Sequence, residues 1–241
     1  MSDGVLLIHA FPLDGRMWEA QRLSPRTVAP DLPGFGMAPA GGPTMTMASA
    51  AARCLEVADA AGLDRFVVCG LSMGGYVSFE LWRTARDRIA GLVLANTRAG
   101  ADTPEGAQGR RDLAARLRAQ GNVLAAAPPP LLAENAPDRL QQRVRGWIAD
   151  QSAEAIAAAA EGMAERADST PDLPGIDVPT LVITSDGDRL IPAEASADMA
   201  EAIPGARLEI LPSVGHLSNV EAPARFTELL RAHVIACGVE P

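Results

Sequence analysis

Short apolar runs recur along the chain, and longer amphipathic segments separate them. Six runs rich in Val, Ile, Leu and Ala have the length of β-strands: residues 5–9, 27–30, 65–70, 90–95, 180–184 and 207–211. Most are continuously apolar rather than alternating, which is typical of strands covered by helices on both faces. Four segments have the apolar spacing of helices: residues 47–61, 75–86, 193–203 and 222–236. The pattern predicts an α/β fold with a doubly wound, mostly parallel sheet and right-handed crossovers.

The segment over residues 101–175 breaks this alternation, because no run in it has the character of a strand. Three of its stretches have helical composition and begin with Pro or Ser: residues 104–120, 137–149 and 152–167. We therefore expect an α/β core over residues 1–100 and 176–241, and a helical insertion over residues 101–175. An insertion at this point lies above the carboxyl ends of the strands, where α/β sheets bind ligands. We interpret it as a cap over an active site; the alternative is a set of extra packing helices.

A G-x-S-x-G motif spans residues 70–74, between an apolar run and a helical segment. Strand, sharp turn and helix in this order are typical of a nucleophile elbow, with Ser72 as the nucleophile. A side chain at Gly70 or Gly74 would collide with the neighbouring strand and helix, and the serine is expected in a strained backbone conformation. Ser72 Oγ is thereby raised above the sheet, where it can attack a carbonyl group.

Candidates for the base and the acid of a Ser-His-Asp triad follow later in the chain. His216 comes after the last predicted strand, at the same edge of the sheet as Ser72, and is the predicted general base. Asp186 and Asp188 both lie in the turn after the preceding strand, where a carboxylate can receive the histidine Nδ1–H. This turn leaves the choice between the two aspartates open, since Asp-Gly-Asp is also an ordinary turn sequence.

The turn after the first strand, residues 9–12, is expected to complete an oxyanion hole. The backbone N–H groups of Phe11 and Met73 are the predicted donors. His9 is expected to be a structural hydrogen-bonding residue beneath this turn, and His233 a surface residue of the last helix. The three histidines are dispersed and no cysteine cluster accompanies them, so we predict no metal site.

The composition limits the partners of the protein. Asp and Glu number 30 against 21 Lys and Arg, and the formal charge of −9 opposes binding to nucleic acid or to an anionic membrane surface. Cys54, Cys69 and Cys237 are odd in number and far apart, which fits a reduced cytosolic protein. The first residues lack the features of a signal peptide, and no apolar stretch is long enough to span a membrane. We expect a cytoplasmic monomer or homodimer whose partner is a small molecule.

Together these residues resemble the α/β-hydrolase superfamily over essentially the whole chain. The matching segments are residues 9–12, 31–36, 70–75 and 215–221, with Asp188 four residues before Pro192. In that family the acid usually precedes a proline by four residues, so the resemblance implies Asp188 rather than Asp186 as the acid. Within the superfamily, the G-H-L-S-N-x-E run at residues 215–221 is similar to that of small bacterial carboxylesterases and 3-oxoadipate enol-lactonases.

Two features depart from the family's pattern. Ala10 stands where many members have Gly, a small change that narrows the oxyanion turn slightly. The chain begins close to the strand that ends at His9, so the antiparallel hairpin that usually precedes it is expected to be reduced. The sheet should then have about six strands, with residues 27–30 as an exposed edge that a dimer contact could cover.

The resemblance implies a serine hydrolase without a cofactor, which cleaves small carboxylic esters through an acyl-enzyme on Ser72. A lactone hydrolase like the 3-oxoadipate enol-lactonases is the alternative, and it would need cationic or hydrogen-bonding groups at the pocket. Trp147, with Arg143 or Arg145, is the candidate pocket set; the alternative is a packed tryptophan beside surface arginines. Arg110 is expected on the solvated face of a cap helix. A different class is a ligand receptor with an intact triad and slow turnover, which single-turnover kinetics would reveal.

Overall fold

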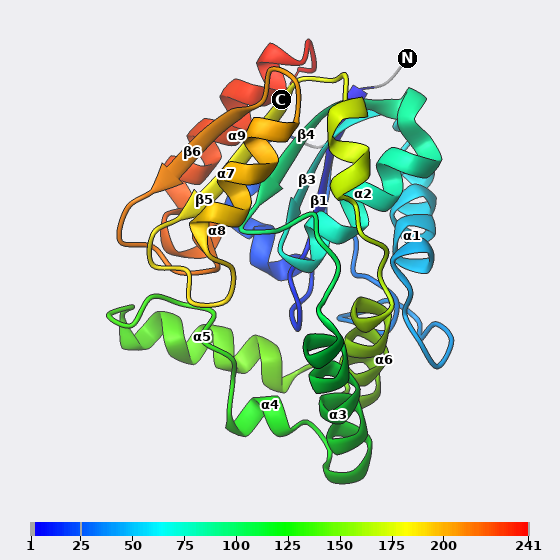
Figure 1. Ribbon diagram of the computed structural model, residues 1–241, viewed down its shortest axis with the longest axis vertical. Helices are drawn as coiled ribbons and strands as arrows, with labels where there is room; N and C mark the ends of the chain where they lie inside the picture. Colours follow the sequence, from blue (N-terminus) through cyan, green and yellow to red (C-terminus); the bar gives the residue numbers. More distant parts are fainter. Residues whose placement is uncertain (1–2, 25, 241) are drawn as a thin grey trace.

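One parallel β-sheet forms the centre of the computed structural model, which describes residues 3–24 and 26–240 (Figure 1). Its strands follow the order β2-β1-β3-β4-β5-β6, and all neighbouring pairs run parallel. The bounds are β1 (Asp3–Ile8), β2 (Thr27–Val28), β3 (Arg65–Leu71), β4 (Ile89–Ala95), β5 (Thr180–Ser185) and β6 (Arg207–Leu211). The predicted α/β class and the six-stranded parallel sheet are confirmed for the described part of the chain.

Helices cover both faces of this sheet, and alternate residues of each strand contact opposite layers. Leu6 and Ile8 belong to one apolar core, and Val5 and Leu7 belong to the other. The first core includes the helices α1 (Met47–Ala60), α2 (Met73–Ala85) and α7 (Ala193–Ala202). The second includes the 3-10 helix η1 (Gly15–Gln21) and helix α9 (Pro223–Ala236). Burial on both faces explains why the strands read as continuous apolar runs.

The segment between β4 and β5 is helical, as its composition predicted. It contains α3 (Pro104–Gln120), α4 (Val123–Ala126), α5 (Asp138–Ala149) and α6 (Ala153–Ala164), followed by the 3-10 helix η3 (Thr170–Gly175). In Figure 1 the four α-helices, drawn in green, lie together beyond the carboxyl ends of the strands. They therefore lie over the edge of the sheet that carries the predicted catalytic residues.

Helix α6 docks on the loop that leads into α1. The N–H of Met45 donates to the carbonyl of Ala158 at 3.0 Å. Gly162 allows this approach, because a Cβ atom there would lie 1.7 Å from the carbonyl oxygen of Met45. Arg118, on α3, adds ion pairs to Glu154 and Glu161 on α6, so the two helices are joined by charge as well as by apolar contact.

Two predicted elements end more than one residue earlier than expected. Strand β2 stops at Val28, and Pro30 lacks the N–H that a longer ladder would require. Helix α6 ends at Ala164 rather than at residue 167, where the Arg166 guanidinium donates to the Met163 carbonyl at 2.9 Å and satisfies an acceptor at the helix end. Short elements that the pattern did not predict are η1, α4, η2 (Arg86–Arg88), η3 and α8 (Ser218–Glu221). None of the helices in the described ranges has the length and apolarity needed to cross a membrane.

Candidate active site

Ser72 occupies the turn between β3 and α2, with φ of 57° and ψ of −114°. A non-glycine residue in this region is strained, and the surrounding bonds hold it there. Its N–H donates to the carbonyl of Ala95 at 2.9 Å, and its carbonyl accepts from Thr97 Oγ1 at 2.8 Å. The strain and its supports match a nucleophile elbow, in which the serine side chain is held away from the sheet.

The two glycines of the motif are required by close backbone contacts. A Cβ atom on Gly70 would lie 2.2 Å from the carbonyl oxygen of Gly74. A Cβ atom on Gly74 would lie 2.2 Å from the carbonyl oxygen of Ile8, on the neighbouring strand. Such distances are far below van der Waals contact, so the tight turn at Ser72 can form only with glycine at both positions.

His216 and Asp188 meet between the loops that follow β6 and β5. The Nδ1 atom of His216 lies 2.8 Å from Oδ2 of Asp188, and the His216 side chain is 2% exposed. Asn96 Nδ2 donates to the same oxygen at 3.0 Å, and the N–H groups of Leu190 and Ile191 donate to Oδ1 at 2.8 and 3.1 Å. These hydrogen bonds hold the Asp188 carboxylate in place, and the carboxylate in turn keeps the imidazole ring of His216 in one orientation.

The environment of Asp188 favours the ionised carboxylate. Burial acts to raise its pKa, but the hydrogen bond and charge of His216, the Leu190 N–H and the Asn96 amide outweigh that effect. The pKa of Asp188 consequently lies below its ordinary value. Asp188 is thus an anion at neutral pH and can stabilise an imidazolium on His216.

Asp186, the competing candidate, has a different partner. Its Oδ1 accepts a hydrogen bond from the N–H of Ser213 at 2.5 Å, in the turn after β6. This bond joins two loops at the sheet edge and leaves the contact with His216 to Asp188. The turn sequence alone did not distinguish the two carboxylates, because both lie within hydrogen-bonding reach of the last loop.

The N–H groups of Phe11 and Met73 are free of protein acceptors among the described residues. Met73 is the first residue of α2, where helix N–H groups have no partner within the helix. Phe11 follows β1 and lines the same pocket as Ser72. Two unpaired donors beside a serine are the arrangement expected of an oxyanion hole.

Ser72 and His216 line one pocket with a volume of about 200 Å³. Its walls are mainly apolar. They come from the core, from helices α3 and α6, and from the Pro-rich loop that follows α4. The lining residues are Phe11, Ser72, Tyr76, Arg98, Arg110, Pro129, Leu131, Met163, Leu190, Ile191 and His216. A pocket of this size, with few polar groups, fits a small molecule.

Arg98 and Arg110 line the pocket although the sequence pattern did not indicate it. Arg110 was expected on the solvated face of α3, but it lines the pocket and forms an ion pair with Asp102. Helical spacing did not reveal this, because the partner that turns the side chain inward lies in the loop before the helix. A basic residue within a cap helix was the only available signal.

Two further residues support the histidine loop. Asn96, at the carboxyl end of β4, bonds to Asp188 and also accepts from Ser218 Oγ at 2.6 Å. Glu221 accepts from the N–H of Gly215 at 2.9 Å and from the N–H of Ala133 at 3.0 Å. Burial raises the pKa of Glu221 above its ordinary value, against the effect of these two bonds. Glu221 thereby ties the Pro-rich loop to the loop that carries His216.

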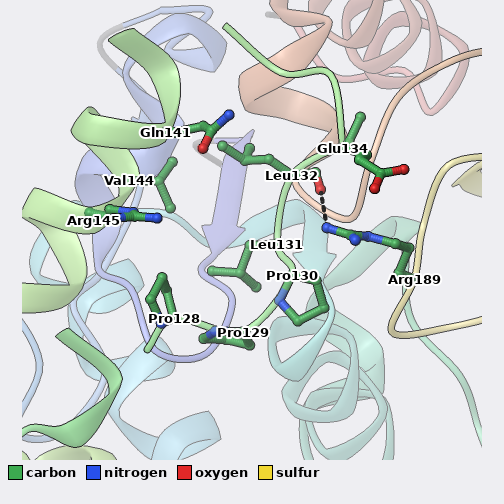
Figure 2. A pocket seen from close by; sticks show the side chains of 11 residues that line it. Pro128, Pro129, Pro130, Leu131, Leu132, Glu134, Gln141, Val144, Arg145 and Arg189 are labelled. Carbon is green, nitrogen blue, oxygen red and sulfur yellow. Dashed lines mark hydrogen bonds between the residues drawn. The ribbon is translucent and has the colours of Figure 1, made fainter. Parts of the chain in front are cut away.

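Trp147 lies outside the Ser72 pocket. It is buried on α5, and the Arg143 guanidinium stacks 4.8 Å from its ring centroid while pairing with Glu19 at 2.6 Å. Arg145 lines a neighbouring hollow of about 270 Å³ (Figure 2). There α5 provides one wall and Arg189 lies on the other side, where its guanidinium donates to the Leu132 carbonyl at 3.5 Å.

The other two histidines, His9 and His233, have structural positions. His9 Nε2 accepts from the N–H of Leu32 at 3.0 Å and Nδ1 lies 3.0 Å from the Ala10 carbonyl, which fixes the turn after β1. His233 was expected at the surface, but it is 3% exposed, because α9 turns that position toward the sheet. Burial lowers the pKa of both residues. Within the described ranges, no three His, Cys, Asp or Glu residues are grouped as metal ligands.

The comparison with known proteins agrees with this fold. The model of the alpha/beta hydrolase family matches residues 5–229, so the chain belongs to this family. A solved structure of a thermophilic esterase from Thermogutta terrifontis, with malate bound, is 39% identical, with a TM-score of 0.92 over 98% of this chain and 90% of that one. The enol-lactonase from Burkholderia xenovorans LB400 is 29% identical, with a TM-score of 0.84 over 98% and 92% of the two chains.

A curated relative extends the range of hydrolases to which the chain is similar. The 2-hydroxymuconate semialdehyde hydrolase of Pseudomonas putida is 29% identical over 213 residues, which are 85% of this chain and 75% of that protein. The names of these similar proteins thus include an esterase, an enol-lactonase and a semialdehyde hydrolase. Family membership identifies a hydrolase fold and leaves the substrate to the chemistry of the pocket.

Proposed function

We propose that the protein is a serine hydrolase that cleaves small carboxylic esters through an acyl-enzyme on Ser72. The observation that carries the proposal is the strained Ser72 at the elbow, in one pocket with a histidine bonded to a buried aspartate. Similarity to a solved esterase at 39% identity over nearly the whole chain supports the same reaction class.

The proposed reaction has two halves, acylation of Ser72 and hydrolysis of the acyl-enzyme. Nε2 of His216 takes the proton of Ser72 Oγ as this oxygen attacks the ester carbonyl, and Asp188 stabilises the imidazolium through Nδ1. The N–H groups of Phe11 and Met73 donate to the oxyanion. His216 then protonates the leaving alcohol. In the second half, His216 takes a proton from the water molecule that attacks the acyl-enzyme and gives it to Ser72 Oγ as the acid departs.

A lactone hydrolase is the second candidate, since lactone opening uses the same steps with the alcohol retained in the product. The likeness to the Burkholderia enol-lactonase favours it, together with two arginines at the pocket. The two candidates differ in the substrate and share the nucleophile, so one nucleophile test serves both.

The test is steady-state hydrolysis of p-nitrophenyl esters, from acetate to octanoate, by the wild type and by Ser72→Ala. We expect multiple turnovers by the wild type, a short optimal acyl chain because the pocket holds only about 200 Å³, and a loss of at least about 1,000-fold in kcat in the variant. Ser78→Ala is the matched control, because this serine lies on α2 but bonds to the Gly74 carbonyl instead of lining the pocket.

Turnover that survives in Ser72→Ala would identify another nucleophile and contradict the proposal. Wild-type protein that forms one acyl adduct and releases it over hours would favour a slow receptor instead. A fluorophosphonate probe followed by peptide mass spectrometry identifies the modified serine in either case.

A further inference from the structure

Two arginines line the Ser72 pocket. Arg98 comes from the loop after β4, and Arg110 comes from α3. Among the described residues, neither Asp nor Glu lines this pocket. The pocket of a protein with a formal charge of −9 is therefore locally positive.

One buried carboxylate holds both guanidinium groups in place. Asp102, with its side chain 2% exposed, accepts from Arg98 through Oδ1 and from Arg110 through Oδ2. Arg166, only 3% exposed, donates to Asp102 Oδ2 at 2.8 Å. Three cations share one anion here, so positive charge remains after the ion pairs are formed.

The group is rigid before any ligand binds. Arg166 stacks on Tyr76, 4.1 Å from the ring centroid, and also donates to the carbonyls of Met163 and Gly100 at 2.9 Å each. Tyr76 and Met163 line the pocket themselves. A preorganised set of donors loses little conformational entropy when it binds an anion.

Several donors of the pair are unused. Arg98 Nη1 and Arg110 Nη2 donate to no acceptor in the described part of the chain, and Arg98 Nε is buried without a partner. A guanidinium presents five N–H donors, and a carboxylate is the acceptor that best matches their planar arrangement. An anion in the pocket would satisfy donors that the protein leaves unpaired.

We propose that Arg98 and Arg110 bind an ionised carboxylate of the substrate. The preferred substrates are then small esters or lactones that carry a second, free carboxylate. This inference rests on the proposed function, since it takes Ser72 as the group that attacks the ester. Arg145 and Arg189 do not serve this purpose, because they line the neighbouring hollow beyond Pro129 and Leu131 (Figure 2).

The test compares two substrates that differ only in charge: the p-nitrophenyl monoester of glutaric acid with a free carboxylate, and the same compound with that carboxylate methylated. We expect the wild type to favour the free carboxylate in kcat/KM by at least about 10-fold, because only the ionised group accepts charge-assisted hydrogen bonds from the guanidinium groups. Arg98→Met and Arg110→Met should each lower kcat/KM for the anionic ester about 10- to 100-fold, mostly through KM.

Three controls separate recognition of the anion from general damage. In the arginine variants, hydrolysis of the methylated ester should fall less than hydrolysis of the anionic ester. Arg110→Lys should retain part of the preference because it keeps the charge without the planar donors. Arg111→Met removes a charge from the exposed neighbour on α3 and should leave the preference unchanged. Equal loss for both esters, or a wild type that prefers the methylated ester, would overturn the inference.

A binding measurement distinguishes failure of this inference from failure of the proposed function. Glutarate is titrated into Ser72→Ala and into Ser72→Ala with Arg110→Met by isothermal calorimetry. Binding that Arg110→Met weakens at least about 10-fold supports the carboxylate site even if no ester is hydrolysed. Ester hydrolysis that depends on Ser72, with no carboxylate preference and no arginine-dependent glutarate binding, would reject the carboxylate site and leave the serine hydrolase in place.

Discussion

His216 Nδ1 lies 2.8 Å from Asp188 Oδ2, a bond between two loops that are 28 residues apart in the chain. The two loops follow neighbouring strands of the parallel sheet, β5 and β6. Their carboxyl ends meet at one edge, beside the turn that carries Ser72. Sheet topology, rather than proximity in sequence, therefore assembles the proposed triad.

Removal of the Asp188 charge should disable the histidine with little effect on the fold. We expect Asp188→Asn to lower kcat by about 1,000- to 10,000-fold, because an amide neither stabilises the imidazolium nor selects the required tautomer. Asp186→Asn is the matched control: it changes an aspartate bonded to Ser213 and should retain activity within about 3-fold. The measurement is ester hydrolysis by both variants, and the reverse order of effects would assign the acid to Asp186.

The elbow should reject a single methyl group. Gly74→Ala would place a Cβ atom 2.2 Å from the carbonyl oxygen of Ile8, in the backbone of β1, so we expect a loss of at least about 2 kcal/mol in the free energy of unfolding together with loss of activity. Gly109→Ala on α3 is the control, because the added Cβ atom meets nothing within 4 Å. The substitution also replaces a flexible glycine within a helix. Urea unfolding should show that Gly109→Ala is neutral or stabilising by about 0.5–1 kcal/mol.

The docking of α6 depends on Gly162. A Cβ atom there would lie 1.7 Å from the Met45 carbonyl oxygen, so Gly162→Ala should displace the helix, and with it Met163 in the pocket wall. We expect faster proteolytic cleavage within residues 101–175 and a changed KM for esters. Gly146→Ala on α5 has open space around its new Cβ atom and should show neither effect. Unchanged proteolysis in Gly162→Ala would mean that the loop before α1 yields to the added methyl group.

Asp102 should make the arginine group sensitive to acid. Burial acts to raise the pKa of Asp102, but the hydrogen bonds and charges of Arg166 and Arg110 outweigh this effect. They lower the pKa of Asp102 from 3.8 to about 2. Because the folded-state value lies below the unfolded one, the stabilisation is complete above about pH 4 and is lost as the pH falls through 2. The shift corresponds to about 2 kcal/mol.

The measurement is urea unfolding of the wild type and Asp102→Asn between pH 6 and pH 2.5. We expect the variant to be less stable by at least about 2 kcal/mol at pH 6, since it leaves buried Arg166 without its anion, and the difference should shrink toward low pH. Asp150→Asn, which alters an aspartate that is 60% exposed and pairs with Arg16, is the control for a surface ion pair. A difference that stays constant with pH would contradict the assignment of the low pKa to Asp102.

The sequence by itself determined the elements that local periodicity encodes. Continuous apolar runs predicted the strands, and the Ser72 motif with its two glycines predicted the sharp turn, because each of these depends on neighbouring residues alone. Parallel strands joined by helices bring all their carboxyl ends to one edge, so the positions of His216 and of the turn with Asp186 and Asp188 after their strands placed them near Ser72. The choice of Asp188 over Asp186 came from the family resemblance.

Only the tertiary structure decided which side chains of the helical segment reach the pocket. Arg110 turns inward because Asp102, eight residues earlier in a loop, is buried beside Arg166 from the far end of α6. Trp147 belongs to the other core, together with residues of η1, and Arg143 on the same helix pairs with Glu19 of η1. Helical spacing shows that a helix has an apolar face but not the partner of that face. Long-range packing, and the need to pair buried charge, therefore determined the pocket that would select the substrate.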